Sequence, residues 1–239
     1  MKAMILAAGQ GTRLRPLTDH IPKPMVLVAG KPILEHNLEL LTRHGISDVV
    51  INLHHQPQTI VDHFGDGSRW GVHITYSFEP ELLGTAGAVK RVQEQFDSTF
   101  LVLYGDNLTT CDLTRLTVFH QAKGGIATIA LHYRDDPTAS GIATLDDRDR
   151  ITRFVEKPMP HQIFSLWVNA GILVLEPEVL DVTPEGGPSD LGRDLFPSLL
   201  ARGEAIYGYR MSQGEYLWWI DTPEDLQRVK AIWEERRVR

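Results

Sequence analysis

The sequence predicts an α/β fold, a mixed and mostly parallel sheet flanked by helices, with a β-rich lobe in the second half. In the first half, apolar runs of strand length alternate with helical patterns, the rhythm of a parallel sheet covered by helices. From residue 126 onward, short strands separated by turn signals predominate. The 239 residues, 42% of them hydrophobic, are enough to bury a full core.

Four strands are expected in the first half, each a short apolar run bounded by polar turns. They span residues 3–8, 48–53, 72–78 and 99–104. Apolar residues spaced three to four apart predict helices between them, over residues 33–44, 59–64 and 86–96. Ligands of open α/β sheets gather at the carboxyl ends of strands, so we expect the loops after Ala8, Phe78 and Tyr104 to converge.

The second half is expected to contain four strands and two helices. The strands span residues 126–133, 141–145, 151–155 and 167–175, and the helices span residues 191–201 and 224–235. Thr222 and Pro223 open the last helix as an N-cap and a first-turn proline. No repeat or linker separates the halves. We therefore expect one domain over residues 1–239, with residues 1–110 and 111–239 as its two halves.

The net charge and the cysteine content of the chain limit the classes of partner and the cellular compartment that we expect. The net charge of −7 and the pI near 5.8 argue against nucleic acid or an anionic membrane, since both need a basic face. No run approaches the roughly 20 apolar residues of a membrane span. Cys111 is the single cysteine, which excludes an intrachain disulfide. A cytoplasmic protein with small-molecule partners is expected, and its oligomeric state is left open.

The loop after the first strand, residues 6–24, predicts a grip for a polyphosphate. Gly9 and Gly11 allow backbone N–H groups to approach an anion, and Arg13 and Lys23 add positive charge. A solvated Gly-rich turn is the alternative. The spacing excludes two known phosphate motifs, because the third glycine of G-x-G-x-x-G and the G-K-[ST] of a P-loop are both missing.

Two aspartates are candidates for holding a metal ion. Asp106 follows the strand that ends at Tyr104, and Asp221 precedes the last helix. Each also has a common structural explanation, as a turn former and as a helix N-terminal acid. Lys23 lies between Pro22 and Pro24, whose rigid backbone restricts where its ammonium group can go.

Six motifs in this order resemble those of sugar-1-phosphate nucleotidyltransferases, also called nucleoside-diphosphate-sugar pyrophosphorylases. They read G-x-G-T-R-L-x-P-L-T, K-P-M, L-G-T-A-G, Y-G-D-N, E-K-P and N-A-G, and they cover nearly the whole chain. The resemblance implies a Rossmann-like fold with a β-rich sugar-binding lobe. It also implies an enzyme that joins a nucleoside triphosphate to a sugar 1-phosphate, releases pyrophosphate and uses Mg²⁺.

The same resemblance assigns roles to residues of this sequence. Arg13 and Lys23 are the expected catalytic residues, and Asp106 and Asp221 the expected metal ligands. The expected nucleotide-binding residues are Leu6, Ala8, Gly9, Gly11, Thr12, Arg13, Lys23, Glu79, Gly84, Thr85 and Asp106. The expected sugar-phosphate-binding residues are Asn107, Gly141, Glu156, Lys157, Asn169 and Asp221.

The choice of nucleobase depends on Glu79 and the L-G-T-A-G loop. This loop resembles that of mannose-1-phosphate and heptose-1-phosphate guanylyltransferases. A Glu79 carboxylate can accept from guanine N1 and N2, although Glu79 can equally face water. GTP and mannose 1-phosphate are therefore expected. The alternatives are uridylyl or thymidylyl transfer to another sugar 1-phosphate, of glucose, heptose or N-acetylmuramate type, or a non-catalytic regulatory subunit that binds nucleotide sugars.

Overall fold

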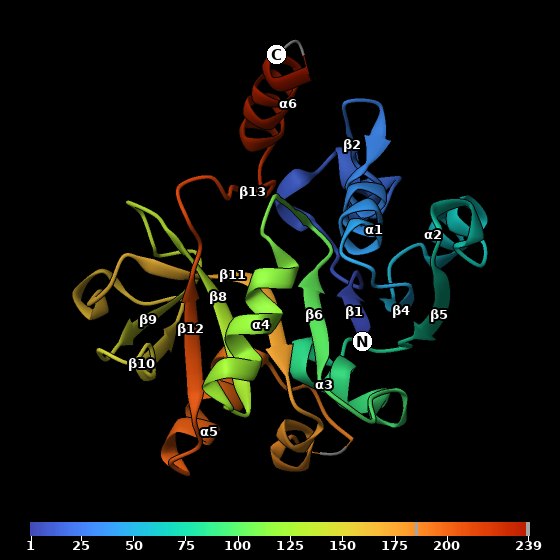
Figure 1. The fold of residues 1–239 in the computed structure, drawn as a ribbon. Coiled ribbons are helices and arrows are strands. Elements are labelled where there is room, and N and C mark those ends of the chain that lie inside the picture. Colours follow the sequence, from blue (N-terminus) through green and yellow to red (C-terminus); the bar gives the residue numbers. More distant parts are fainter. Residues whose placement is uncertain (185, 238–239) are drawn as a thin grey trace. The chain divides into compact units, whose positions relative to one another are not determined.

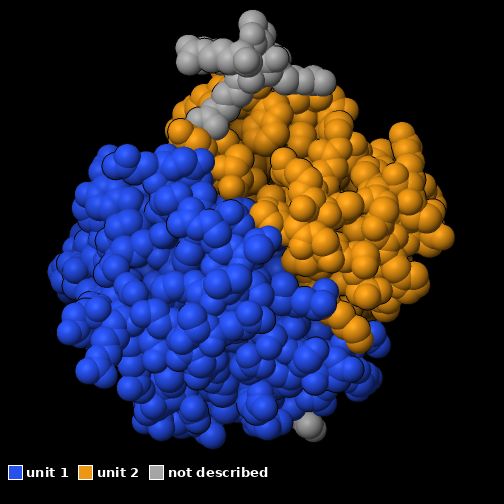
Figure 2. Space-filling view, in the orientation of Figure 1, with its two compact units in different colours: residues 1, 82–103, 111–215 blue, residues 2–81, 104–110, 216–239 orange. Residues whose placement is uncertain are grey.

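The computed structural model describes residues 1–184 and 186–237, which form two compact units (Figure 2). Unit 1 comprises residues 1, 82–103 and 111–215, and unit 2 comprises residues 2–81, 104–110 and the segment from residue 216 onward. The chain therefore passes between the units after residues 1, 81, 103, 110 and 215. The C-terminal segment belongs to the same unit as the N-terminal loop.

Unit 2 contains a parallel sheet. Its strands β1 (Lys2–Leu6), β4 (Asp48–Leu53) and β5 (His73–Phe78) pair in that order, with Ile5 opposite Ile51 and Ile51 opposite Tyr76 (Figure 1). The crossovers contain α1 (Ile33–Arg43) and α2 (Pro57–Phe64). Parallel strands are covered on both faces, which explains why β1 and β4 are nearly continuous apolar runs.

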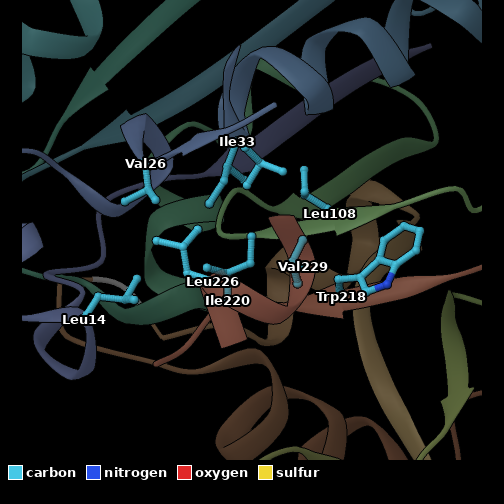
Figure 3. Packing of buried hydrophobic residues seen from close by; sticks show 9 residues of the cluster. Leu14, Val26, Ile33, Leu108, Trp218, Ile220, Leu226 and Val229 are labelled. Atoms are coloured by element: carbon cyan, nitrogen blue, oxygen red, sulfur yellow. The ribbon is translucent and has the colours of Figure 1, made fainter. Parts of the chain in front are cut away.

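An apolar cluster in unit 2 joins the N-terminal loop to the last helix (Figure 3). Two short antiparallel pairs contribute to it, β2 (Leu27–Val28) with β3 (Lys31–Pro32) and β7 (Asn107–Thr109) with β13 (Leu217–Trp219). Helix α6 spans Pro223–Arg237. The buried members of the cluster are Leu14, Val26, Val28, Ile33, Leu108, Trp218, Ile220, Leu226 and Val229. This packing fixes the backbone on both sides of the candidate site residues Lys23 and Asp221.

Unit 1 contains a mostly antiparallel group of strands. Strand β8 (Ala127–Tyr133) lies between β11 (Trp167–Leu175), antiparallel, and β12 (Ile206–Arg210), parallel. Strand β11 also pairs with β6 (Phe100–Tyr104) and with the hairpin of β9 (Gly141–Leu145) and β10 (Ile151–Glu156). The helices of unit 1 are α3 (Gly84–Arg91), α4 (Leu113–Lys123) and α5 (Phe196–Ala201). Helix α4 packs on β8, β11 and β12.

The predicted α/β class is confirmed, and β4, β9 and β11 match the expected strands residue for residue. The helix expected over residues 191–201 is instead a π-helix, Leu191–Leu195, that continues into α5. The helix expected over residues 86–96 begins at Gly84 and ends at Arg91, before a 3-10 turn at Gln93–Gln95. Among the described residues, no helix is long and apolar enough to cross a bilayer.

Sequence reasoning missed helix α4 and the strands β7, β12 and β13. Helix α4 is hard to recognise because His120 occupies one of its buried positions, where periodicity requires an apolar residue. The ring nitrogens of His120 bond to Thr128 Oγ1 and Glu176 Oε1, both at 2.9 Å. Partners that come from other elements thus satisfy this buried polar group, and the sequence of the helix alone does not show them.

Glu215 stabilises the end of unit 1 as a buried hydrogen-bond acceptor. Its carboxylate accepts from the backbone N–H groups of Asp112 and Ser212, both at 2.7 Å, and from the hydroxyl groups of Ser212 and Tyr209. Burial alone would raise the pKa of Glu215, but the hydrogen bonds from Ser212 and Asp112 outweigh it and lower the pKa below its usual value. The ionised carboxylate therefore contributes stability, which is lost as the pH falls through the lowered pKa.

Glu215→Ala is expected to lower the free energy of unfolding by about 2 kcal/mol, because it removes a buried carboxylate that accepts from two part-buried backbone N–H groups. Urea unfolding at neutral pH measures the change. The exposed Glu178 of the same unit provides the control, and Glu178→Ala is expected to unfold as the unsubstituted protein does. Equal midpoints for the two variants would contradict the assigned role.

Candidate active site

The N-terminal loop of unit 2 folds onto itself. Gly11 has a left-handed backbone with φ of 63°, and its carbonyl accepts from the Thr18 hydroxyl at 2.7 Å. A Cβ at Gly11 would lie 3.0 Å from both Lys23 Cβ and Thr18 Cγ2, so only glycine fits this close approach. Leu14, in the following 3-10 turn, is anchored in the apolar cluster. Hydrogen bonding and Leu14 thus hold the loop in place, while most of its other residues are exposed.

Lys23 connects two distant carboxylates within unit 2. Its Nζ donates to Asp106 Oδ2 at 2.7 Å and to Asp221 Oδ1 at 2.8 Å, although these residues are 83 and 198 positions away in the sequence. The Lys23 side chain is only 7% exposed. Arg13 Nη2 also donates to Asp221 Oδ1, at 3.0 Å, from a side chain that is 59% exposed. We call Arg13, Lys23, Asp106 and Asp221 the cation–carboxylate cluster.

The charges of this cluster keep Lys23 protonated. Burial by itself would lower the pKa of Lys23, but the charges and hydrogen bonds of Asp106 and Asp221 outweigh it and raise the pKa above its ordinary value. The pair between Arg13 and Asp221 is exposed and contributes little stability, so this guanidinium group is available for other anions. The cluster thus brings two positively charged side chains and two carboxylates together at one place.

Gly105 is a further residue that shapes this site. Its N–H donates to the Leu6 carbonyl at 2.9 Å, and a Cβ there would lie 2.8 Å from Ile5 Cγ2 and 2.9 Å from Leu6 O. Gly105 therefore permits the segment that carries Asp106 to lie against the end of β1. The Y-G-D-N motif includes Gly105, but the sequence did not show that close packing against β1 requires a glycine at this position.

Glu79 is turned into the protein and does not face water. It is 4% exposed, and its Oε1 accepts from Asn52 Nδ2 at 2.7 Å. Asn52 Oδ1 in turn accepts from the Ala7 N–H at 2.8 Å. Because a backbone amide only donates and a carboxylate only accepts, both ends of the Asn52 side chain are fixed. Asn52 thereby ties Glu79 to the end of β1, a link that sequence reasoning missed.

In unit 1, Gly84 and Thr85 contact residues 189–191, which lead into the π-helix. A Cβ at Gly84, whose φ is 70°, would lie 2.4 Å from Ser189 O. The Thr85 hydroxyl donates to Asp190 Oδ2 at 2.9 Å and accepts from the Leu191 N–H at 2.7 Å. The Thr85 side chain is therefore used within the protein, which leaves its backbone for any contact with a nucleotide.

Glu156, at the end of β10, lies between two glycines. A Cβ at Gly141 or at Gly192 would lie 2.5 Å or 2.3 Å from Glu156 Oε2. Burial, followed by the charge of Asp190, raises the pKa of Glu156 to about 6. Lys157 has a left-handed backbone with φ of 48°, a conformation that costs about 1–2 kcal/mol for a side chain of this kind.

The remaining expected residues divide between the units. Asn169 in β11 is buried, and its Oδ1 accepts from the N–H of Gly171 at 2.9 Å. Asn107, in β7 of unit 2, is also buried. Unit 2 holds Leu6, Ala8, Gly9, Gly11, Thr12, Arg13, Lys23, Glu79, Asp106, Asn107 and Asp221, and unit 1 holds Gly84, Thr85, Gly141, Glu156, Lys157 and Asn169.

A family model described as nucleotidyl transferase matches residues 2–235. The chain belongs to this family. It is 42% identical to a UTP--glucose-1-phosphate uridylyltransferase of Synechocystis sp. and 39% identical to a mannose-1-phosphate guanylyltransferase of Mycobacterium tuberculosis. These matches cover 97% and 96% of this chain and 63% of each relative. The chain thus spans less than two thirds of their length.

Two solved structures share the fold of this member of the family. A putative glucose-1-phosphate thymidylyltransferase from Bacillus anthracis, in complex with a sucrose, has a TM-score of 0.87 at 26% identity and covers 97% of this chain and 94% of its own. HddC from Yersinia pseudotuberculosis, complexed with GMP-PN, has a TM-score of 0.80 at 25% identity and covers 97% and 99%. The resemblance stated from the sequence motifs is confirmed at the level of the family.

Glu156→Gln is expected to stabilise the protein by about 1–2 kcal/mol near pH 7.5, because a neutral amide has no charge to desolvate at this partly buried position. The direction of the expected pH dependence of stability follows from the raised pKa of Glu156. The folded protein binds more protons than the unfolded chain between the ordinary pKa of 4.5 and about 6, so stability falls as the pH rises through this window.

Thermal unfolding between pH 4 and pH 8 measures this effect. The exposed Glu94 of unit 1 gives the control, and Glu94→Gln is expected to retain the pH dependence of the unsubstituted protein. A melting temperature that is lower for Glu156→Gln than for the unsubstituted protein at pH 7.5 would refute the prediction.

Proposed function

We propose that this chain catalyses nucleotidyl transfer, joining a nucleoside triphosphate to a sugar 1-phosphate with release of pyrophosphate. The observation that carries the proposal is the buried Lys23 ammonium group, held between Asp106 and Asp221 beside Arg13. Membership of the nucleotidyl transferase family supports it.

The reaction requires charge neutralisation more than proton transfer. An oxygen of the sugar phosphate attacks the α-phosphorus of the triphosphate, and the bond to pyrophosphate breaks. The attacking phosphate has a second pKa of about 6 and is mostly dianionic at neutral pH, so no general base is needed. Lys23 stabilises the charge on the phosphoryl group under attack, and Arg13 that on the leaving pyrophosphate.

Asp106 and Asp221 suit a hard divalent ion. Both carboxylates already direct an oxygen to one cation, the Lys23 ammonium group, within 2.8 Å. Mg²⁺ is usually held by one or two carboxylates together with phosphate oxygens and water, which matches this pair. We propose that these two aspartates hold Mg²⁺, which when bound supplies neutralisation of phosphate charge.

The residues of unit 1 fit the sugar phosphate. In this proposal, the Glu156 carboxylate accepts from sugar hydroxyl groups, Lys157 binds the phosphate, and Gly141 and Asn169 contact the sugar. The left-handed backbone of Lys157 supports this role, because residues kept in a costly conformation cluster at functional sites.

For the nucleobase, we propose GTP, with mannose 1-phosphate as the sugar substrate. The L-G-T-A-G loop and a carboxylate at position 79 support guanine. Because Asn52 holds Glu79 in a buried position, recognition by Glu79 is confined to the small part of its side chain that remains exposed. UTP with glucose 1-phosphate is the second candidate, favoured by the relative from Synechocystis.

A pyrophosphate-release screen of five nucleoside triphosphates against a panel of sugar 1-phosphates tests the proposal. Turnover that requires both substrates and Mg²⁺ supports it, and the preferred pair fixes the base and the sugar. Equal rates with GTP and UTP would remove the argument for guanine. Nucleotide-sugar binding without turnover of any pair would favour the regulatory subunit. We propose a reducing, cytoplasmic setting, which suits the single buried thiol of Cys111.

A further inference from the structure

In unit 1, the segment of residues 189–192 runs from the L-G-T-A-G loop to Glu156. At one end, Ser189 donates its N–H to the Leu83 carbonyl at 2.8 Å, and its own carbonyl accepts from the N–H groups of Ala86 and Gly87. At the other end, the segment enters the π-helix that contains Gly192. π-Helical turns are rare and are frequent at functional sites.

Both carboxylate oxygens of Asp190 accept hydrogen bonds that hold this segment in its turn. Oδ1 accepts from the N–H groups of Gly192 and Arg193, both at 2.9 Å, and Oδ2 accepts from the Thr85 hydroxyl, also at 2.9 Å. One side chain thus caps the first turn of the π-helix and attaches it to Thr85 in the first turn of α3.

The folded turn brings Gly192 against Glu156. A Cβ at Gly192 would meet Glu156 Oε2, Cδ and Cγ at 2.3, 2.9 and 3.3 Å, so the carboxylate rests directly on the glycine. Gly192 does not have a left-handed backbone. Its lack of a side chain is therefore required by Glu156 and not by its own conformation.

We propose that Asp190 is a positioning residue for Glu156, because its carboxylate folds the turn that places Gly192 against the Glu156 side chain and fastens that turn to the L-G-T-A-G loop. This inference rests on the proposed function, in which Glu156 binds the sugar. It adds Asp190 and Gly192 to the residues that determine the affinity for the sugar phosphate.

The first test is a double-mutant cycle between Gly192 and Glu156. Gly192→Ala is expected to raise KM for the sugar 1-phosphate by about tenfold or more, since a displacement of 1 Å at a binding group has effects of this size. KM for the nucleoside triphosphate is expected to stay within about twofold. Adding Gly192→Ala to Glu156→Ala is expected to have no further effect, because the displaced carboxylate is then absent.

Gly187→Ala is the matched control. Gly187 lies two residues before this segment, has no left-handed backbone, and has no atom within 4 Å of the position of a Cβ. It is expected to leave both KM values unchanged. The inference is overturned if Gly192→Ala raises KM for the sugar phosphate equally in the Glu156→Ala background, or if Gly192→Ala leaves this KM unchanged.

The second test separates the geometry of Asp190 from its charge. Asp190→Ala is expected to raise KM for the sugar phosphate as Gly192→Ala does, and Asp190→Asn is expected to restore it, since the amide oxygen can still cap the turn. The charged groups that act on Glu156 are Asp190, Lys157 and Arg193. Asp190→Asn removes the single negative one among them, so Glu156 is expected to titrate at a lower pH than in the unsubstituted protein.

Titration of Glu156 by carbon-13 NMR requires no substrate. It therefore tests the positioning role of Asp190 separately from the proposed nucleotidyl transfer. If the unsubstituted protein turns over no substrate pair but Asp190→Asn shifts the titration, the placement of Asp190 beside Glu156 stands and the proposed function fails. If the unsubstituted protein is active but Asp190→Ala keeps its KM for the sugar phosphate, the positioning role fails and the proposed function stands. An identical Glu156 titration in both proteins also overturns the positioning role.

Discussion

Lys23→Ala is expected to lower kcat by about a thousandfold, because it removes the preorganised charge that we place at the phosphoryl group under attack. In the structure its ammonium group is buried and fixed by Asp106 and Asp221, so no reorganisation is needed when the negative charge develops. KM for the triphosphate is expected to change less than kcat, since the interaction strengthens in the transition state. Steady-state release of pyrophosphate measures both parameters.

Lys31 supplies the matched control for this substitution. Its ammonium group also lies between two carboxylates of unit 2, those of Glu35 and Glu39, but its side chain is 40% exposed. Lys31→Ala removes an equal charge and breaks equivalent ion pairs away from the cation–carboxylate cluster. It is expected to retain full activity. Steady turnover by Lys23→Ala would refute the mechanism proposed here.

Asp106→Asn has the second largest expected effect. It keeps the size of the side chain but removes one of the two charges that we propose for Mg²⁺, so we expect a loss of about a hundredfold in kcat/KM at fixed Mg²⁺. The Mg²⁺ concentration for half-maximal rate is expected to rise by about tenfold or more. The rate as a function of Mg²⁺ concentration checks both effects.

The control for the metal prediction is Asp62→Asn. Asp62 lies on α2 in the same unit and accepts a hydrogen bond from Gln58 on the surface of that helix. Its Mg²⁺ dependence is expected to equal that of the unsubstituted protein. If Asp106→Asn has the same Mg²⁺ dependence as Asp62→Asn, Asp106 is not a ligand of the metal.

Elements with a clear apolar period were predictable from the sequence. Strands β4, β9 and β11 match the expected residues, because a mostly apolar run between turn signals depends on local sequence alone. Helix α4 was not predictable in this way, since its buried His120 is compensated by Thr128 and Glu176. The short strands β7 and β13 were also missed. Each has three residues and exists through its partner.

The family and the chemical types of the candidate site residues could be inferred from short contiguous motifs such as K-P-M and E-K-P. The folded structure showed which of these residues meet. It joined Lys23 to carboxylates 83 and 198 positions away, turned Glu79 inward onto Asn52, and placed Gly192 against Glu156. The physical reason is that a buried charge or amide must find its partners in space, and chain separation carries no information about them.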